Sequence, residues 1–282
     1  MVKACTGEAL KSLYAEPRNV GSEPIMTGLA KWLLPVIWGV FSQAVWAHET
    51  RVLVGGYNFP PYLNVLTADR FEGATVELLE HLNALQDEVH FLLAPMTASS
   101  RYVSYRHGRF DVIFFESADW WQAQDADIEF SAPIAVDRDL YIALDDGHRD
   151  QSYFDDLSSA RLIAAAGYHY GFADFDANQS NLEARFNISF APNPETSLVM
   201  LERDRGDVAL VNESFLVACE LRGHPLPDLL VAEQADRDYQ LSVGVRPQST
   251  LALEQLVDWL QQLRVAGRLA EIEARWGIHW LE

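Results

Sequence analysis

The sequence contains very little cysteine. Its 282 residues include two cysteines, Cys5 and Cys219, and Cys5 precedes a segment that has the features of an export signal. The exported chain would therefore carry Cys219 alone, which excludes an intrachain disulfide even in an oxidising compartment. We expect Cys219 to be a small buried apolar residue on a helix.

Long hydrophobic runs are also missing. The apolar run Trp32 to Phe41 has ten residues, whereas a membrane-spanning helix needs about 20. Lys31 precedes this run, and Val45-Trp-Ala47 follows it with small residues at the −3 and −1 positions. This pattern predicts a secretory signal that starts at Met26 and is cleaved after Ala47, so that residues 1–47 are an upstream extension and signal peptide.

Positive charge is scarce. Residues 48–282 carry 17 basic and 38 acidic side chains, and all of these basic residues are arginine. A strongly acidic surface repels phosphate groups and anionic membranes. We therefore expect no nucleic-acid partner and no direct membrane insertion after the signal is cleaved.

Motifs for catalysis and metal binding are absent from the sequence. It has no nucleophile motif, no phosphate-binding loop and no HExxH, and its eight histidines are scattered. We expect no catalytic residue, no metal site and no cofactor.

The most informative stretch that is present is a strand followed by an aromatic loop. Arg51 to Val54 is a short apolar run, Gly55-Gly56 breaks it, and Tyr57-Asn-Phe-Pro-Pro-Tyr62 follows. Because ligand crevices of open α/β sheets lie beyond the carboxyl ends of strands, these rings are predicted to line a cleft. The alternative is a core strand with an aromatic surface turn.

The chain contains two successive units of alternating strands and helices. Each ends in a buried strand and a polar pair, Glu116-Ser117 in the first unit and Asn212-Glu213 in the second. In the first unit we expect strands at 51–54, 89–93 and 110–115 and helices at 76–85 and 100–107. In the second we expect strands at 161–166, 188–190 and 207–211 and helices at 174–185 and 195–203.

Two short extended segments, Asp139 to Ala143 and Tyr239 to Val245, are predicted to pair as hinge strands. An amphipathic helix at 249–264 and a last short helix after it are expected to cover the first unit. The predicted fold is therefore α/β and two-lobed, with a ligand cleft between the lobes. Lobe 1 would comprise residues 48–138 and 246–282, and lobe 2 residues 139–245 with the hinge strands.

Six segments along the chain together form a recognisable pattern: Gly56–Tyr62, Glu72–Leu78, Gly108–Val112, Phe130–Pro133, Gly206–Leu210 and Leu263–Ile272. In order and spacing they resemble the bacterial extracellular solute-binding proteins of family 3, the amino-acid-type periplasmic binding proteins of ABC transporters. The resemblance covers residues 51–280 and implies a type II periplasmic-binding-protein fold that closes around one small ligand by hinge motion.

The resemblance also implies where the ligand lies. Phe59 falls where the family has an aromatic residue that packs on the ligand, and Ala166 to His169 fall where backbone N–H groups receive a carboxylate. Tyr168 and His169 replace the hydroxyl residues that are usual there. The candidate ligand-binding residues are Tyr57, Phe59, Arg101, Glu116, Ser117, Trp121, Tyr168, His169 and Asn212.

Two positions depart from the family pattern. Members that bind α-amino acids have an arginine beyond the third strand that forks onto the ligand carboxylate, but Ser117 to Gln124 contains none. They also have an acid for the ligand ammonium where this sequence has Asn212. Arg101 is a candidate for the missing cation, and its alternative role is a solvated helix residue.

The sequence therefore predicts a monomeric periplasmic protein that captures a small polar or amino-acid-like solute. Its partner would be an ABC transporter permease in the inner membrane. Two alternatives stay open. A secreted enzyme resembling cyclohexadienyl dehydratases would use Glu116 and His169 as acid and base, and a sensing protein would present its bound solute to a receptor.

Overall fold

The computed structural model describes residues 50–122, 124 and 126–282. All of these residues belong to one compact unit. The upstream extension and signal peptide predicted for residues 1–47 lie outside the described residues.

A mixed sheet of eleven strands forms the framework of the described chain. Its main path runs β4 (Val89–Pro95), β1 (Thr50–Gly56), β5 (Val112–Glu116), β12 (Arg237–Val245), β7 (Ala135–Leu144), β10 (Val208–Asn212), β8 (Leu162–Ala165) and β9 (Ile188–Ala191). Three short strands pair beside this path: β6 (Glu129–Phe130) with β12, and β11 (Leu229–Val231) and β13 (His279–Trp280) with β7. A separate hairpin joins β2 (Asn64–Thr67) to β3 (Arg70–Glu72).

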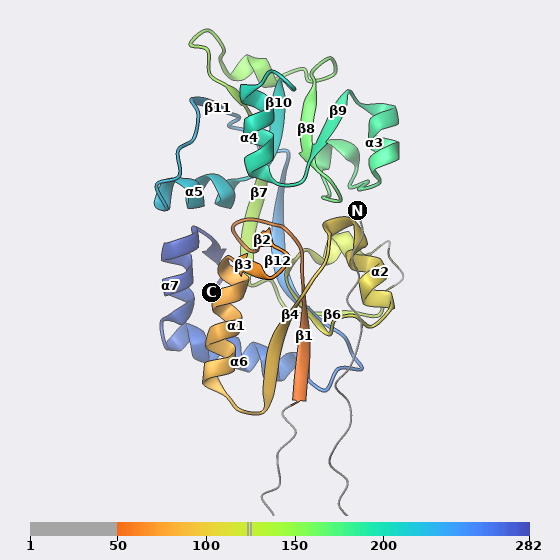
Figure 1. The fold of residues 1–282 in the computed structure, drawn as a ribbon, viewed down its shortest axis with the longest axis vertical. Coiled ribbons are helices and arrows are strands. Elements are labelled where there is room, and N and C mark those ends of the chain that lie inside the picture. Colours follow the sequence, from red (N-terminus) through yellow and green to blue (C-terminus); the bar gives the residue numbers. More distant parts are fainter. Residues whose placement is uncertain (1–49, 123, 125) are drawn as a thin grey trace, which may run out of the picture. The chain divides into compact units, whose positions relative to one another are not determined.

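Strand direction divides this sheet into two parallel groups joined by an antiparallel pair. β1 is parallel to β4 and β5, and β8 is parallel to β9 and β10. β12 and β7 pair antiparallel between the two groups and continue into both (Figure 1). The fold is thus the two-lobed type II arrangement expected from the sequence, with β7 and β12 as hinge strands.

The helices follow the apolar spacing of the sequence. In the first lobe α1 (Ala74–Leu85), α6 (Leu253–Val265) and α7 (Arg268–Trp276) pack together, and Leu78, Leu82, Leu256 and Ile272 are fully buried in the core that contains β1. This burial explains why apolar residues recur at helical spacing there. The remaining helices are α2 (Arg101–Arg106), α3 (Gln179–Arg185), α4 (Pro194–Glu202) and α5 (Glu213–Leu221). Cys219 lies buried on α5, as predicted.

Two helix starts differ from the sequence prediction. The helix expected at 174–185 begins at Gln179, because Asp174 and Phe175 have positive φ angles of 54° and 62° and the Asn178 side chain caps the N–H of Asn181. The helix expected at 249–264 begins at Leu253. Hinge strand β7 also begins earlier than predicted, at Ala135, because Ala135 pairs with Leu241 of β12.

Candidate functional site

The aromatic loop after β1 is buried at the junction of the lobes. Tyr57 is 6% exposed and Phe59 5% exposed. The ring of Phe59 lies 4.7 Å from that of Tyr62 and 5.4 Å from that of Tyr168, which comes from the second lobe. The alternative interpretation of this loop as an aromatic surface turn is therefore wrong.

A buried ion pair lies next to this loop. Arg101 at the start of α2 and Glu116 at the end of β5 are 1% and 0% exposed, and Arg101 Nε lies 3.3 Å from Glu116 Oε2. Arg101 Nη1 donates to the carbonyl of Ala98 at 2.6 Å and to that of Gly167, in the second lobe, at 2.9 Å. The interpretation of Arg101 as a solvated helix residue is therefore wrong.

Two neutral side chains complete the surroundings of the Glu116 carboxylate. The Tyr57 hydroxyl donates to Oε1 at 2.5 Å and the Trp121 indole N–H donates to Oε2 at 2.6 Å. Burial raises the pKa of Glu116, while Arg101 and these two donors act to lower it. Both carboxylate oxygens are thus held by groups of the same lobe.

The guanidinium of Arg101 also lies among aromatic rings. Its central carbon is 5.0 Å from the Tyr57 ring centroid, 4.5 Å from that of Tyr102 and 5.9 Å from that of Trp120. Burial acts to lower the pKa of Arg101, but Glu116 and the neighbouring tyrosines raise it above its ordinary value. Arg101 therefore stays charged inside the protein.

The segment after β8 supplies the contacts of the second lobe. The Tyr168 hydroxyl donates to the carbonyl of Asn58 at 2.7 Å. His169 Nδ1 lies 2.6 Å from the carbonyl of Phe175, and its Nε2 lies 2.6 Å from the Tyr102 hydroxyl. Because a carbonyl only accepts, Nδ1 carries the proton, and Nε2 is the acceptor for the Tyr102 hydroxyl, whose single hydrogen is shared with the carbonyl of Trp120 at 2.9 Å.

His169 is held neutral by these surroundings. Its ring stacks on Trp120 at 5.9 Å with an interplanar angle of 12°. Burial and the charge of Arg101 lower the pKa of His169 to about 4. The imidazole therefore acts as an uncharged hydrogen-bonding link between the lobes at neutral pH.

Gly167 permits the close approach of the two lobes. Its φ is +81°, and a Cβ placed on it would lie 2.5 Å from the backbone nitrogen of Ser99 in the first lobe. Both observations favour glycine, since a side chain would be strained in this conformation and would clash with the backbone opposite.

The turn that follows the predicted carboxylate site at Ala166–His169 binds a carboxylate of the protein itself. The backbone N–H groups of Gly171 and Phe172 begin a short 3₁₀ turn and donate to the side chain of Asp236 at 2.5 Å and 2.8 Å. The donors of this turn are thus already paired.

Asn212 is buried at the end of β10 and joins the lobes. Its Nδ2 donates to the carbonyl of Pro60 at 3.0 Å, to Asp137 Oδ2 at 3.2 Å and to Ser214 Oγ at 2.7 Å. Its Oδ1 is buried and has no hydrogen-bond partner.

Sequence reasoning missed two acids on hinge strand β7. Asp137 and Asp139 are 8% and 3% exposed and lie on one face of the strand, two residues apart. Burial raises the pKa of both carboxyl groups. The sequence did contain a signal for this placement. The two acids alternate with Val136 and Arg138, and residues two apart in a strand share a face.

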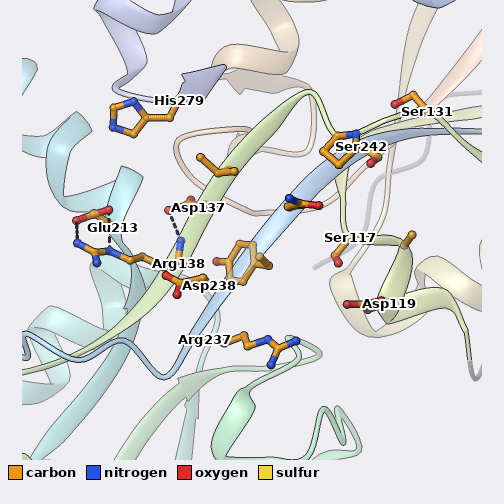
Figure 2. A pocket seen from close by; sticks show the side chains of 15 residues that line it. Ser117, Asp119, Ser131, Asp137, Arg138, Glu213, Arg237, Asp238, Ser242 and His279 are labelled. Atoms are coloured by element: carbon orange, nitrogen blue, oxygen red, sulfur yellow. Dashed lines mark hydrogen bonds and ion pairs between the residues drawn. The ribbon is translucent and has the colours of Figure 1, made fainter. Parts of the chain in front are cut away.

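Ser117 differs from the other candidates because it faces a pocket beside the hinge strands. This pocket of about 620 Å³ lies between Ser117 and Asp119 on one side and Arg138 with Glu213 on the other, as Figure 2 shows. Arg138 holds Glu213 through bonds of 2.9 Å and 2.6 Å, so the hinge strand is tied to the start of α5.

The structure thus brings most of the predicted site residues into one connected cluster. Asn212 joins it through Pro60, and Ser117 lies at its edge. His169 joins it through Tyr102, which contacts both His169 and Trp121. The residues linked by direct contacts are Tyr57, Phe59, Arg101, Glu116, Trp121 and Tyr168. A second pocket, of about 750 Å³, opens beside Trp120 and His169.

The residues described by the structure contain no helix long and apolar enough to cross a membrane. Within the same residues, no group of three or more histidine, cysteine, aspartate or glutamate side chains is placed to hold a metal ion.

The family model of the bacterial extracellular solute-binding proteins, family 3, matches residues 52–279. The chain belongs to this family. No curated protein matches the sequence, but many solved structures of this fold do.

Two amino-acid-binding proteins illustrate the structural similarity. A substrate-binding protein of an ABC uptake transporter from Streptococcus pneumoniae, solved with bound histidine, has a TM-score of 0.64 at 19% identity and covers 80% of this chain and 92% of its own. A mutant of ArgBP from T. maritima has a TM-score of 0.61 at 20% identity, with 80% of this chain and 94% of that chain covered. At these identities the likeness shows the fold alone.

A third solved structure is connected with an enzyme. It is the ancestral amino acid-binding protein AncCDT-1, described as a precursor of cyclohexadienyl dehydratase. Its TM-score is 0.59 at 13% identity, with 81% of this chain and 95% of that chain covered. It too shows the fold alone.

Proposed function

We propose that this family member is a periplasmic binding protein that captures a small polar or amino-acid-like solute between its two lobes. The observation that carries the proposal is a set of polar contacts between the lobes. Arg101 donates to Gly167, Tyr168 donates to Asn58, and Asn212 donates to Pro60. Contacts of this kind stabilise the closed state alone and are lost when the lobes part.

The lobes in this proposal divide within the hinge strands. Residues 48–138 and 246–282 form lobe 1, and residues 139–245 comprise lobe 2 with the hinge strands. The two crossings lie in β7 and β12, whose pairing runs from Ala135 opposite Leu241 to Asp139 opposite Arg237. A bend in this pair would open the cleft without breaking either core.

The ligand in this proposal lies among the clustered side chains. Phe59, Tyr57 and Tyr168 would supply apolar contact area, and Glu116, His169 and Asn212 would supply polar contacts. Arg101 and Trp121 would hold Glu116 in place, and Ser117 would lie at the edge of the site. The solved structures with histidine- and arginine-binding proteins of the same fold support a ligand of amino-acid size.

Export and delivery complete the proposal. The signal peptide would direct the chain to the periplasm, and the closed monomer would present both lobes to an ABC transporter permease in the inner membrane. The family membership supports both steps.

A thermal-shift screen tests the proposal. The purified protein would be partly unfolded and refolded to remove carried solute, then melted with amino acids, amines, organic acids and sugars. A ligand at 100 times its dissociation constant adds about 2.7 kcal/mol of stability, which is a shift of several degrees for a chain of this size. A panel without any shift would contradict the proposal.

The variant Phe59→Leu tests the position of the ligand. Leucine keeps most of the buried volume but removes the ring face, so binding of a compound found in the screen should weaken at least tenfold. Phe154→Leu, in a 3₁₀ turn of the second lobe outside the cluster, is the matched control and should bind like the wild type. Equal affinity of the two variants would remove Phe59 from the site.

The dehydratase alternative receives no support from the geometry of its two candidate groups. Glu116 is bonded to Tyr57, Trp121 and Arg101, while His169 is bonded to Tyr102 and Phe175. If prephenate were consumed rather than bound, the enzyme interpretation would replace the present one.

A further inference from the structure

The two lobes also meet on a flank of the molecule that is separate from the aromatic cluster. Helix α5 of the second lobe packs beside α7 of the first (Figure 1). The approach is close, because a Cβ placed on Gly277 would lie 2.6 Å from Val217 Cγ1. None of the predicted ligand-binding residues lies in either helix, so this flank is a second set of contacts between the lobes, outside the proposed solute site.

Arg222, directly after α5, contacts two groups of the first lobe. Its Nη1 and Nη2 donate to the two carboxylate oxygens of Glu72 in β3, both at 3.2 Å, and its central carbon lies 4.5 Å from the ring centroid of Trp276 in α7. The hydrogen bonds from Arg222 hold the pKa of Glu72 below its ordinary value. Because a bidentate pair fixes the guanidinium in one orientation, Arg222 ties the lobes together in this structure.

A second acid lies close to Arg222, but in the same lobe. Glu195, in the first turn of α4, lines a small cavity of about 30 Å³ together with Arg222 and Trp276. Its Oε2 is buried without a hydrogen-bond partner, and within the described residues its carboxyl group forms no ion pair. Burial raises the pKa of Glu195, while the nearby His224 acts to lower it. Glu195 is thus an acid without a cation, beside a cation that is paired with another acid.

The proposed division of the lobes makes the two acids competitors for one guanidinium. Glu72 belongs to lobe 1 and would move away from Arg222 when the lobes part. Glu195 belongs to lobe 2 and would keep its place beside Arg222, so rotation of the arginine side chain alone would bring the two together. A partly buried charge that loses its partner is costly, which favours this exchange.

Trp276 adds to the difference between the two arrangements. It is 5% exposed, and its indole Nε1 is buried without a partner at the same cavity as Glu195. Parting of the lobes would expose this N–H and the Glu195 carboxyl to water, which removes the cost of two unpaired buried polar groups. The joined flank therefore combines one favourable charged contact with two unfavourable polar ones.

We infer that Arg222 is a two-position switch that sets the closing equilibrium of the lobes: it pairs with Glu72 when the lobes are together and with Glu195 when they are apart. This inference rests on the proposed function, because it requires that the lobes part. The apparent affinity of a solute depends on the fraction of protein in the binding-competent arrangement. Arg222 is thus a positioning residue for solute capture, although it contacts no solute.

The two acids have opposite predicted effects on this equilibrium. Glu72→Gln removes the partner of Arg222 in the joined state and should lower the population of joined lobes. Glu195→Gln removes the partner in the open state and should raise that population. A flank that served only for packing would not give effects of opposite sign.

Pulsed electron–electron double resonance on the purified protein, freed of carried solute, measures this population without any ligand. Spin labels on cysteines introduced at His107 and Glu183 would report the distance between the lobes, since both positions are exposed and lie on different lobes. Circular dichroism and melting curves of each variant establish that it is folded.

The ratio of short to long distances should fall at least about threefold in Glu72→Gln and rise at least about threefold in Glu195→Gln, equivalent to about 0.65 kcal/mol in each direction. The matched control is Glu77→Gln. Glu77 also pairs with an arginine, Arg275 at 2.8 Å, but both residues lie in lobe 1, so the ratio should not change.

Arg222→Met isolates the part that the arginine plays. Without the guanidinium neither acid has a partner to exchange, so addition of Glu72→Gln or Glu195→Gln to this variant should leave the ratio unchanged. If Glu195→Gln still raised the ratio threefold in the Arg222→Met background, Glu195 would act through its own burial, and the switch would be refuted.

The outcomes separate the inference from the proposed function. Equal ratios in Glu72→Gln, Glu195→Gln and the control, or shifts of the same sign, would overturn the inference while leaving solute binding in place. If the wild type gave one narrow distribution and no compound of the thermal-shift panel bound, the proposed function would fall and the inference would fall with it.

Discussion

Replacement of Glu116 by glutamine is the sharpest test of how the cleft is held together. Glu116 is fully buried, receives hydrogen bonds from Tyr57 and Trp121, and faces Arg101 at 3.3 Å. Glutamine has the same shape, so the perturbation is the loss of one negative charge and of one acceptor atom. Arg101, 1% exposed, would remain as a buried cation without its partner.

The expected cost follows from that burial. Removal of one partner from a buried ion pair costs about 3–5 kcal/mol, because the remaining charge can neither reach water nor find a second counter-ion. The NH₂ group of the new glutamine would also face an N–H of Trp121 or Arg101. Two donors would then point at each other, which adds to the cost. We therefore expect Glu116→Gln to lower the free energy of unfolding by about 3–5 kcal/mol.

Urea unfolding at neutral pH measures this value, with Glu271→Gln as the control. The pair Arg268–Glu271 also joins an arginine to a glutamate, but its side chains are 48% and 54% exposed, so its loss should change stability by less than about 0.5 kcal/mol. The double variant Arg101→Met with Glu116→Gln should recover much of the loss. If Glu116→Gln and Glu271→Gln had equal stability, the account of the buried pair would be refuted.

Two further predictions concern the contacts between the lobes. The pKa of His169 is lowered to about 4 from 6.5, so on acidification the unfolded chain binds a proton before the folded protein does. The contribution of His169 to the free energy of unfolding is therefore complete above about pH 6.5. It should fall by up to about 3 kcal/mol as the pH drops to about 4. Urea unfolding across this range should show a smaller pH dependence for His169→Gln than for the wild type. An equal pH dependence of the two proteins would contradict the lowered pKa of His169. Gly167→Ala should keep the lobes apart and weaken ligand binding, because the added Cβ would lie 2.5 Å from the backbone nitrogen of Ser99. Gly108→Ala has a similar positive φ of +66° and nothing within 4 Å of the added Cβ, so it should cost only backbone strain of about 1 kcal/mol and leave the affinity unchanged.

Most of the fold could be predicted because its strands are continuous apolar runs. Val112 to Phe115 and Val208 to Val211 are buried on both faces, which is typical of parallel strands covered by helices. The false helix start at Asp174 had a tertiary cause. The carbonyl of Phe175 bonds to His169, and the Arg237 guanidinium lies over the Phe175 ring at 4.9 Å, and neither contact is visible in the local sequence.

The candidate site could be predicted only where residues follow the end of a strand. Tyr57 and Glu116 were found because loops at the carboxyl ends of parallel strands meet at one edge of the sheet. Asp137 and Asp139 were missed because acids alternating with arginine resemble a solvated strand. Their burial depends on the pairing of β7 with β10 and β12, which the sequence does not specify locally.

The central claim is that the lobes close around a small solute, and a distance between the lobes tests it most directly. Cysteines introduced at His107 and Glu183, both exposed and on different lobes, would carry spin labels. Burial raises the pKa of the native Cys219 thiol to about 11, so this residue should not react.

Pulsed electron–electron double resonance would then be recorded on the protein freed of carried solute, before and after addition of the compound that raises the melting temperature most. The account predicts a longer, broader distance distribution without the compound and a shorter, narrower one with it, which matches the distance between the two positions in the present structure. An unchanged distribution at saturating compound would contradict the account.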